Sequence, residues 1–387
     1  MDAGTSRKAI VIGAGIGGLC TALSLQQQGW RVAIYDKATS LREAGAGIVL
    51  AANAMKALDL LGIGETVRNV GAPVIQADIR KWDGTIITSL PAAKQAALYG
   101  TQSYVIHRAD LQAILVQAVT DTTTIQTNKQ WIDGTQSEQG VKAVFQDGTQ
   151  EYADVIIGSD GFHSAVRERL FGQSPVRYSG YIALRGVCTQ EEARNTTQGG
   201  GFEALGPGKR FGLSSLGNGR VFWFAAINAP QGKLPPVKER QSELLRQFHG
   251  WYNPVVSAIE ATEASTILAH NIVDRPLLSK WSSGRVTLLG DAAHPMLPNL
   301  GQGGAQAIED AIVLARCLRN PDIPAALSAY ENARMARTNR IVRMSRSMGR
   351  MVQLENPFLI YCRNKLLASL SDARYISRFD PIIGYEL

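Results

Sequence analysis

Residues 8–36 read KAIVIGAGIGGLCTALSLQQQGWRVAIYD, and this stretch decides the fold. The apolar run 9–12 predicts a buried parallel strand, and 31–35 predicts a second one. Between them, a glycine-rich turn at 13–18 opens a segment whose leucines have helical spacing. An acid, Asp36, follows the second strand directly. This order of elements is typical of a βαβ unit that binds a dinucleotide.

Each position of this fingerprint has a physical reason. Gly13 allows the tight turn into the helix, Gly15 lets a pyrophosphate approach the backbone, and Gly18 allows the helix to pack closely on the sheet. The helix N-terminus offers free N–H groups and partial positive charge to the phosphates. Asp36 can accept hydrogen bonds from ribose hydroxyls. The alternative is a glycine-rich turn in an unrelated α/β protein, and the position of Asp36 argues against it. Both NAD and FAD are compatible with the stretch.

The composition is that of a globular protein with a large core. The 387 residues suffice for two domains or one elaborated domain, and 45% of them are hydrophobic while 19% are charged. The sequence contains neither an apolar run long enough for a membrane span nor a secretory signal at its start. We therefore expect a cytoplasmic protein.

Charge and metal-binding residue types exclude several functions. The four cysteines form no CxxC pair and the five histidines have no metal-ligand spacing, so we expect neither a metal site nor a redox-active disulfide. The formal net charge of +7 favours anionic small molecules through steering. Because no basic patch is interleaved with aromatic residues, a nucleic-acid partner is not expected.

Two stretches depart from the βαβ pattern. Residues 73–105 alternate in strand-like fashion and predict antiparallel strands. Residues 177–272 are also rich in strand patterns, and Asn218-Gly219 between two apolar runs is the strongest hairpin signal in the chain. We interpret them as a second domain, an antiparallel sheet with one or two helices.

The C-terminal third contains another glycine-rich stretch. Residues 284–318 predict a strand, a loop suited to an anion and a long helix, without the acid of a second complete dinucleotide unit. Residues 325–350 continue as a helix with an arginine at nearly every third position, which predicts a solvated helix; a surface for anionic lipid or a polyanion is the alternative. The apolar tail 356–387 either packs or contacts a membrane peripherally.

Three motifs follow one another along the chain: GAGIGG at 13–18 with Asp36, GSDGFHSAVR at 158–167, and GDAAHPMLPNLGQGGAQAIEDA at 290–311. Together they resemble those of the FAD-dependent single-component aromatic hydroxylases, the para-hydroxybenzoate hydroxylase-like group A flavoprotein monooxygenases. The resemblance covers almost the whole chain and is greatest to compact members that act on salicylate, other hydroxybenzoates, nicotinates or urate. It implies an α/β fold: a Rossmann-like FAD-binding domain of the GR2 type, interleaved with an antiparallel-sheet substrate domain and followed by long C-terminal helices.

The resemblance also implies domain limits and site residues. FAD-binding segments would be 1–75, 105–176 and 274–322, substrate-domain segments 76–104 and 177–273, and C-terminal helices 323–387. The residues assigned to FAD are Gly13, Gly15, Gly17, Gly18, Asp36, Lys37, Arg42, Gly47, Arg108, Asp160, Asp291, Pro298, Gly301, Gly303, Gly304 and Ala305. Among them, Asp160 is associated with both FAD and NAD(P)H. Candidate substrate residues are Arg210, Phe222, Phe224 and Met296, for which core packing is the alternative; the sequence identifies no catalytic acid or base.

The implied chemistry is specific. NADH or NADPH reduces the flavin, O2 adds at flavin C4a, and the hydroperoxide hydroxylates or epoxidises a small aromatic or heteroaromatic substrate. Arg210 matches the substrate arginine of urate hydroxylases, but Phe222 replaces its tyrosine partner, which argues against urate. A flavin halogenase is disfavoured because the tryptophans form no Trp-x-Trp-x-Ile-Pro motif. A flavin-binding sensor or scaffold without turnover is the remaining alternative. A monomer or homodimer is expected.

Overall fold

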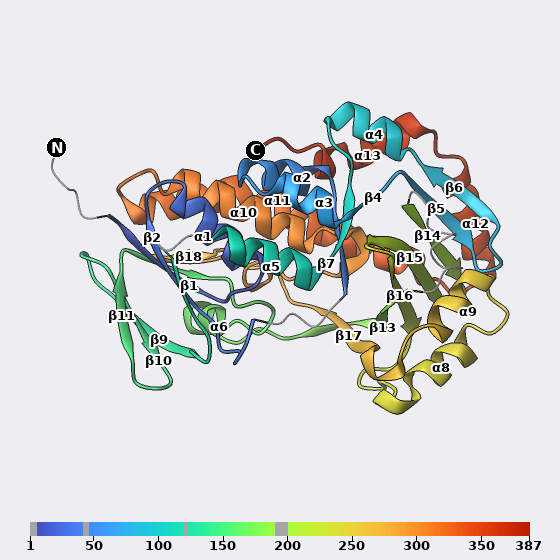
Figure 1. The fold of residues 1–387 in the computed structure, drawn as a ribbon, viewed down its shortest axis with the longest axis horizontal. Coiled ribbons are helices and arrows are strands. Elements are labelled where there is room, and N and C mark those ends of the chain that lie inside the picture. The colour runs from blue at the N-terminus through green and yellow to red at the C-terminus, as the bar shows by residue number, and fades with distance from the viewer. Residues whose placement is uncertain (1–5, 42–45, 120–122, 190–199) are drawn as a thin grey trace.

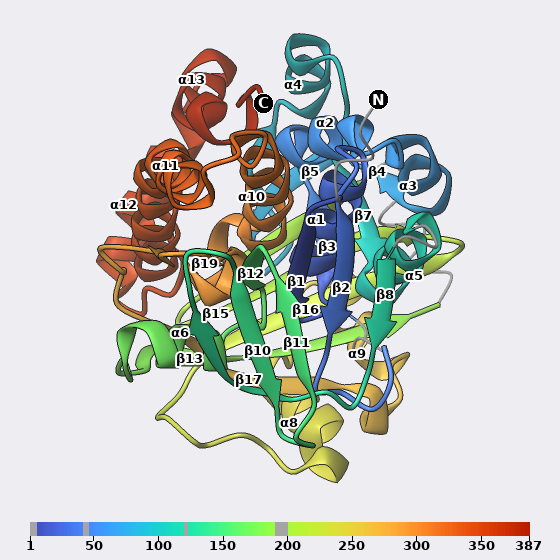
Figure 2. The same ribbon diagram turned by 90° about the vertical axis from the view of Figure 1, so that its left-hand side faces the viewer.

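The structure is a computed structural model that describes residues 6–41, 46–119, 123–189 and 200–387 (Figure 1). The predicted α/β class is confirmed, with two large sheets and long C-terminal helices. Figure 2 shows α10 (Gly303–Cys317) lying between α1 (Ile16–Gln26) and α11 (Ile323–Val352), next to the first sheet. Arg42 lies outside the described residues.

The first sheet contains the dinucleotide fingerprint. Its strand order is β18 (Ser282–Ser283), β19 (Val286–Leu288), β12 (Val155–Gly158), β1 (Lys8–Ile12), β2 (Arg31–Tyr35) and β8 (Thr123–Gln126). All neighbours run parallel except β18 and β19. Three helices pack nearby: α1 (Ile16–Gln26), α5 (Arg108–Ala118) and α10 (Gly303–Cys317). A small antiparallel sheet is formed by β9 (Trp131–Gln136), β10 (Val141–Phe145) and β11 (Gln150–Ala153).

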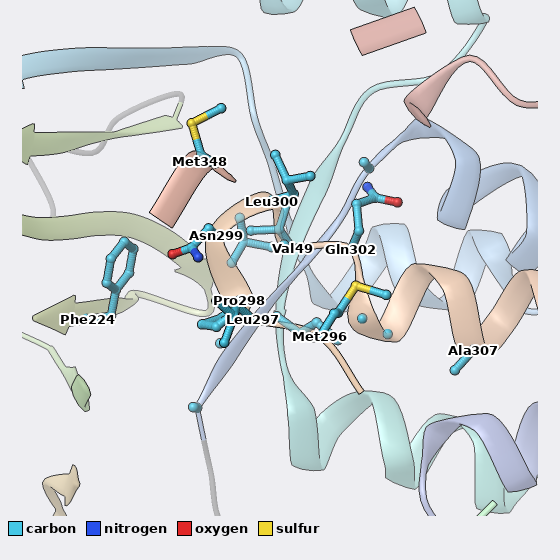
Figure 3. A pocket seen from close by; sticks show the side chains of 18 of the residues that line it. Val49, Phe224, Met296, Leu297, Pro298, Asn299, Leu300, Gln302, Ala307 and Met348 are labelled. Atoms are coloured by element: carbon cyan, nitrogen blue, oxygen red, sulfur yellow. The ribbon is translucent and has the colours of Figure 1, made fainter. Parts of the chain in front are cut away.

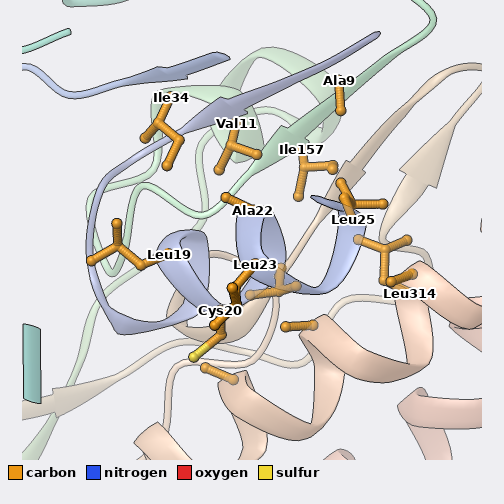
Figure 4. Close-up of a cluster of buried hydrophobic side chains, with 14 of the residues drawn as sticks. Ala9, Val11, Leu19, Cys20, Ala22, Leu23, Leu25, Ile34, Ile157 and Leu314 are labelled. Atoms are coloured by element: carbon orange, nitrogen blue, oxygen red, sulfur yellow. The ribbon is translucent and has the colours of Figure 1, made fainter. Parts of the chain in front are cut away.

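The main hydrophobic core lies between this sheet and its helices (Figure 4). Val11, Ile34 and Ile157 project from the strands towards α1, and Leu25 of that helix meets Leu314 of α10. The central strands β1, β2 and β12 are apolar apart from Lys8 and Arg31, because strands in the middle of a parallel sheet are buried on both faces. This core fixes the distance between α1 and α10, whose N-termini both reach the site described below.

The second sheet has the order β17 (Leu268–Asp274), β13 (Arg177–Cys188), β16 (Arg220–Asn228), β15 (Lys209–Gly217), β14 (Gly200–Gly206), β5 (Gln76–Lys81) and β6 (Ile86–Leu90). The predicted hairpin joins β15 to β16, with positive φ angles of 52° at Asn218 and 71° at Gly219. The sheet is antiparallel, as predicted, except that β14 and β5 pair in parallel. These strands lie far apart in sequence, so no tight turn dictates their direction.

Shorter elements connect the two sheets. A three-stranded sheet has the order β3 (Gly47–Leu50), β7 (Tyr104–His107) and β4 (Ala72–Pro73). The strand pattern predicted across 73–105 is partly wrong, because α4 (Ala92–Tyr99) is a helix. Its alanines, lysine and glutamine favour helix, and Gly100 ends it with a left-handed φ of 72°. The other helices are α2 (Ala52–Leu60), α3 (Gly64–Val70), α6 (Ala165–Phe171), α8 (Arg240–Gln247) and α9 (Asn253–Glu260).

The C-terminal region consists of α11 (Ile323–Val352), α12 (Pro357–Ala368) and α13 (Asp372–Ile383). The prediction that the arginines of α11 are solvated is wrong for half of them. Arg334, Arg337 and Arg346 form ion pairs with buried carboxylates, and the other three arginines of that series are exposed. A helix that turns every 3.6 residues cannot keep a three-residue repeat on one face. Among the described helices, none has the length and apolar character needed to span a bilayer.

Candidate functional site

A cavity of about 1160 Å³ lies between the two large sheets and receives residues from most of the chain. Most of the residues predicted for cofactor and substrate line it: Gly13, Gly15, Gly17, Asp36, Lys37, Gly47, Arg108, Asp160, Arg210, Phe222, Phe224, Asp291, Met296, Pro298, Gly301, Gly303 and Gly304. Gly18 and Ala305 lie behind the wall, where Ala305 is fully buried. The cavity is therefore one space shared by motifs that are far apart in sequence.

The fingerprint end of the cavity is made of backbone. Gly13 has a φ of +105°, and a Cβ there would lie 2.5 Å from the Ser159 carbonyl oxygen. A Cβ on Gly18 would lie 2.0 Å from the carbonyl oxygen of Gly13. Asp36 Oδ2 accepts a hydrogen bond from the Ala14 N–H at 2.7 Å, which holds the acid beside the turn. Only glycine fits at 13 and 18, so the turn and the acid are fixed together.

The Asp160 carboxylate has a structural task as well as a place in the cavity wall. Its Oδ2 accepts hydrogen bonds from the Ala165 N–H at 2.7 Å and the Val166 N–H at 3.3 Å, at the start of α6. The Ser164 hydroxyl donates to Oδ1. Burial raises the pKa of Asp160 and these hydrogen bonds oppose the rise. Asp160 therefore anchors α6 to the end of β12.

The loop between β19 and α10 forms the opposite wall. It contains two short 3-10 turns, η3 (Gly290–Ala292) and η4 (Pro298–Leu300), and leads directly into the helix. Met296 and Gln302 lie beside the start of α10, while Pro298 and Asn299 face Phe224 from the second sheet (Figure 3). A Cβ on Gly304 would lie 2.6 Å from Ile48 Cδ1, so the helix start packs closely against β3.

Buried charges hold this loop in place. The Arg167 guanidinium donates to the carbonyl oxygens of Ala292 and Ala293, both at 3.0 Å. Asp310 of α10 lies 2.6 Å from His294 Nε2 and 2.7 Å from Arg334 Nε. Burial alone would raise the pKa of Asp310, but His294 and Arg334 hold it below its usual value. Sequence reasoning missed this network, because the arginines of α11 looked like surface residues.

The substrate wall is made of side chains from the second sheet. Arg210 is buried, donates to Glu203 Oε1 at 3.0 Å and also donates to Asn299. Its guanidinium carbon lies 5.4 Å from the Phe224 ring centroid and 6.0 Å from that of Tyr181. Its Nε is buried without a hydrogen-bond partner among the described residues. This arrangement can hold a planar, electron-rich ring with an acceptor atom.

Several wall residues were not predicted from the sequence. Tyr181, Arg185, Glu203, His270 and Asn299 all line the cavity. Tyr181 and Arg185 share one face of β13, so the period-two alternation of that strand could have found them once its inner face was known. Asn299 lies within a loop that the sequence had singled out.

The electrostatics of this wall favour an anion. Burial lowers the pKa of Arg185, and the nearby cations Arg108 and Arg210 lower it further while Tyr181 opposes them. Burial also lowers the pKa of His270, with Arg185 and Arg240 adding to the effect. Cations near one another favour bound negative charge, because an anion relieves their mutual repulsion.

The cavity also fits the dinucleotide that the motifs imply. The first turns of α1 and α10, both fully described, carry no acidic side chain and no side-chain cap. Gly15, Gly17, Gly303 and Gly304 place both helix starts on the cavity wall. Uncapped N–H groups and the positive end of the helix dipole suit the phosphates at α1 and an electron-rich ring at α10.

Comparisons with known proteins agree with this geometry. The family model described as "FAD binding domain" matches residues 6–345. Aurachin C monooxygenase/isomerase from Stigmatella aurantiaca is 39% identical over 97% of both chains, and 3-hydroxybenzoate 6-hydroxylase 1 from Aquipseudomonas alcaligenes is 33% identical over 97% of both. The crystal structure of Klebsiella pneumoniae HpxO complexed with FAD and uric acid superimposes with a TM-score of 0.92 at 31% identity, covering 97% of this chain and 96% of that one.

These matches extend over nearly the whole length of the chain, and they include the three motifs that line the cavity. The chain belongs to the FAD-binding-domain family and, within it, to the FAD-dependent single-component aromatic hydroxylases.

Proposed function

We propose that the protein uses NADH or NADPH and O2 to hydroxylate or epoxidise an aromatic or heteroaromatic small molecule. The observation that carries this proposal is the shared cavity, in which the fingerprint turn, the start of α10 and the Arg210–Phe224 wall face one space. Bound FAD supplies the redox chemistry, accepting a hydride and activating O2. The protein supplies binding, orientation and electrostatics.

The residues of the chain have separate tasks in this proposal. The N–H groups at the start of α10 stabilise negative charge on the bound cofactor. Phe224 and Tyr181 contact the faces of the substrate ring, and the terminal nitrogens of Arg210, which already donate to Glu203 and Asn299, offer their remaining N–H groups to an oxygen of the substrate. Leu297 and Met296 exclude water from the reacting atoms.

Phe222 favours a substrate ring that is less polar than urate. Its side chain is buried and packs directly on the backbone of Gly47, where an added Cβ would lie 2.5 Å from the ring. A phenyl ring offers no hydrogen bond to a purine oxygen or nitrogen, so polar substrate atoms at this position would lose their hydrogen bonds with water. We therefore propose a phenolic, quinolone or similar ring as the substrate.

One assay tests the proposal. The purified protein is expected to be yellow with bound FAD, and a panel of phenolic, quinolone and heteroaromatic compounds is expected to stimulate oxidation of NADH or NADPH. Mass spectrometry of the product should show one added oxygen atom. FAD that neither nicotinamide reduces, with any compound of the panel, would indicate a sensor or scaffold instead.

The residues assigned to the cofactor are tested separately. Asp291 lies at the cavity wall where the loop turns towards α10. Because hydrogen bonds to charged groups contribute about 1.5–3 kcal/mol, Asp291→Ala should weaken FAD binding about tenfold or more. Flavin absorbance per protein measures the occupancy. Occupancy equal to that of the unchanged protein at limiting FAD would show that this loop does not hold the cofactor.

A further inference from the structure

The cavity continues past the Arg210 wall into a second compartment. This compartment lies between α4 on one side and α12 and α13 on the other, and its residues belong to the same continuous space. Helices α4 and α13 lie next to each other in Figure 1, although about 270 residues separate them in sequence. The proposed hydroxylation needs only a ring site, so the compartment is unexplained by it.

The walls of the compartment are mainly apolar, although Asp372 and Arg378 of α13 also line it, and the residues from α4 follow helical spacing. From α4 come Ala92, Gln95, Ala96 and Tyr99, which share one face at intervals of three and four residues. From α12 and the turn after it come Leu366, Leu367 and Leu370, and α13 adds Tyr375, Phe379 and Ile383. The two alanines leave space that a larger side chain would fill.

The two walls are tied together, so the compartment is built into the fold. The Tyr99 hydroxyl donates to Asp380 Oδ1 at 3.2 Å, and Lys94 Nζ lies 2.6 Å from Asp372 Oδ2. At the far end of α13, Arg337 donates to the carbonyl oxygen of Ile382 at 2.7 Å. These contacts hold α13 both to α4 and to the buried network beneath the site.

The compartment begins where the substrate wall ends. Burial raises the pKa of Tyr375 to about 12, and the nearby Glu203 and Tyr99 contribute to the rise. Glu203 is the ion-pair partner of Arg210, and Tyr99 belongs to α4. All of these residues line the same cavity as Tyr375. At the other end, Leu366 lines the cavity and is 54% exposed, which places a mouth of the compartment at the surface beside α12.

We propose that this compartment binds an apolar chain attached to the ring of the substrate. The ring occupies the Arg210–Phe224 wall, and the chain extends between α4 and α13 towards Leu366. This inference rests on the proposed function, because it names the class of compound that the same site takes: an aromatic or heteroaromatic ring with an aliphatic substituent of several carbons. Compounds without the chain bind the ring site alone and more weakly.

The test uses the n-alkyl esters of 4-hydroxybenzoate, from methyl to octyl, with the FAD-loaded protein. Isothermal titration calorimetry measures the dissociation constant of each ester without requiring turnover. Burial of each added methylene should tighten binding about fourfold until the compartment is full. Affinity that does not rise with chain length, including no binding of any ester, overturns the proposal.

Two neighbouring alanines provide matched variants. Ala96 lines the compartment and Ala97 is exposed on the opposite face of α4. Ala96→Trp should remove the gain from longer chains while the methyl ester binds as before, and Ala97→Trp should keep the whole series unchanged. Leu370→Trp fills the space from the other wall and should reproduce the effect if Ala96→Trp does not fold. If Ala96→Trp and Ala97→Trp bind the long-chain esters with equal affinity, the proposal is overturned.

The proposed function fails in a different way. If no ester and no compound of the panel stimulates NADH or NADPH oxidation, the hydroxylase proposal is wrong, yet the binding series still reports on the compartment. If the ring compounds stimulate oxidation but the binding series is flat, only the apolar-chain inference is wrong.

Discussion

At the fingerprint end, the cavity wall is backbone from β1, α1 and β2, whereas at the ring end it is side chains from the second sheet. Gly13 and Gly18 cannot accept a Cβ because main-chain atoms occupy its place. Arg210, by contrast, is held by Glu203, Asn299 and two aromatic rings from separate elements. Backbone sites tolerate almost no change, while side-chain sites can be altered without loss of the fold.

The largest effect is expected at Gly13. Gly13→Ala forces a left-handed φ on alanine and drives its Cβ into the Ser159 carbonyl, which belongs to the main chain after β12. We expect a loss of more than about 4 kcal/mol in the free energy of unfolding and no bound FAD. Urea unfolding and flavin absorbance measure the two quantities.

Gly29 is the matched control for Gly13. It lies in the same βαβ unit with a φ of +80°, but nothing lies within 4 Å of an added Cβ. Gly29→Ala should therefore cost only the strain of the left-handed conformation, about 1–2 kcal/mol, and should keep the FAD. Similar losses in both variants would mean that close approach of the backbone does not define the fingerprint end.

The second largest loss of stability is expected from the buried charges that pack beneath both ends of the cavity. Arg334 is fully buried and pairs with Glu309 and Asp310. Arg334→Leu leaves two carboxylates without this cation, so we expect a loss of about 3–5 kcal/mol at neutral pH. Arg340→Leu, an exposed position on the same helix, should change stability by less than about 0.5 kcal/mol.

The pH dependence of this loss has a definite sign. In the unchanged protein the pKa of Asp310 is held below its usual value, so its pair stabilises the fold above the unfolded pKa near 3.8 and the contribution is lost as pH falls through the folded pKa. Without Arg334, burial disfavours the carboxylate, and protonation relieves that cost. The stability difference between the two proteins should therefore narrow towards pH 4. A constant difference from pH 8 to pH 4 would contradict the role of Asp310.

How well the sequence predicts each end follows from the same comparison. The fingerprint end could be predicted because its geometry depends on glycines and an acid within residues 8–36, where local spacing determines the structure. Arg210, Phe224 and Met296 were named only through the family resemblance, and Glu203 and Tyr181 were missed. Their approach depends on the pairing of distant strands, and the alternation along one strand does not show which of its faces meets the cavity.

The helices show a related limit. The length of α11 was predicted, but the burial of Arg334 was not, because its partners lie on another helix more than twenty residues away. The parallel pairing of β14 with β5 also depends on a long-range contact. The periodicity of hydrophobic residues indicates which helices and strands form. The long-range partners of a side chain or a strand depend on tertiary packing, which the periodicity does not contain.

A smaller effect, confined to the ring end, is expected from Arg210→Met. The variant removes the guanidinium donors that we propose for the substrate and leaves the fingerprint end unchanged. Binding of 4-hydroxybenzoate methyl ester should weaken about 10–150-fold, while FAD occupancy stays the same. Arg220→Met on the neighbouring strand, whose partner is Asp110 outside the cavity, is the control and should leave both unchanged. Parallel loss of FAD and ester binding would mean that the two ends are not separable.

The smallest effect is expected at His107, which joins β7 to α5 between the two ends. Its Nδ1 accepts a hydrogen bond from the Ala109 N–H at 3.3 Å and so caps the helix. Burial lowers the pKa of His107, Arg220 adds to this, and Asp110 opposes it. The unfolded chain therefore takes up a proton near pH 6.5 before the folded one does, and stability falls as pH decreases below that value.

Replacing His107 with a helix cap that does not titrate isolates the contribution of this histidine to the pH dependence of stability. His107→Asn should keep stability within about 1 kcal/mol at pH 8 and reduce the loss of stability between pH 7 and pH 5. Urea midpoints at each pH measure the slope, and His249→Asn, at an exposed position, should leave it unchanged. If the dependence of stability on pH is unaltered in His107→Asn, another group causes the acid sensitivity. His270 at the ring end is then the next histidine to replace, because burial lowers its pKa too.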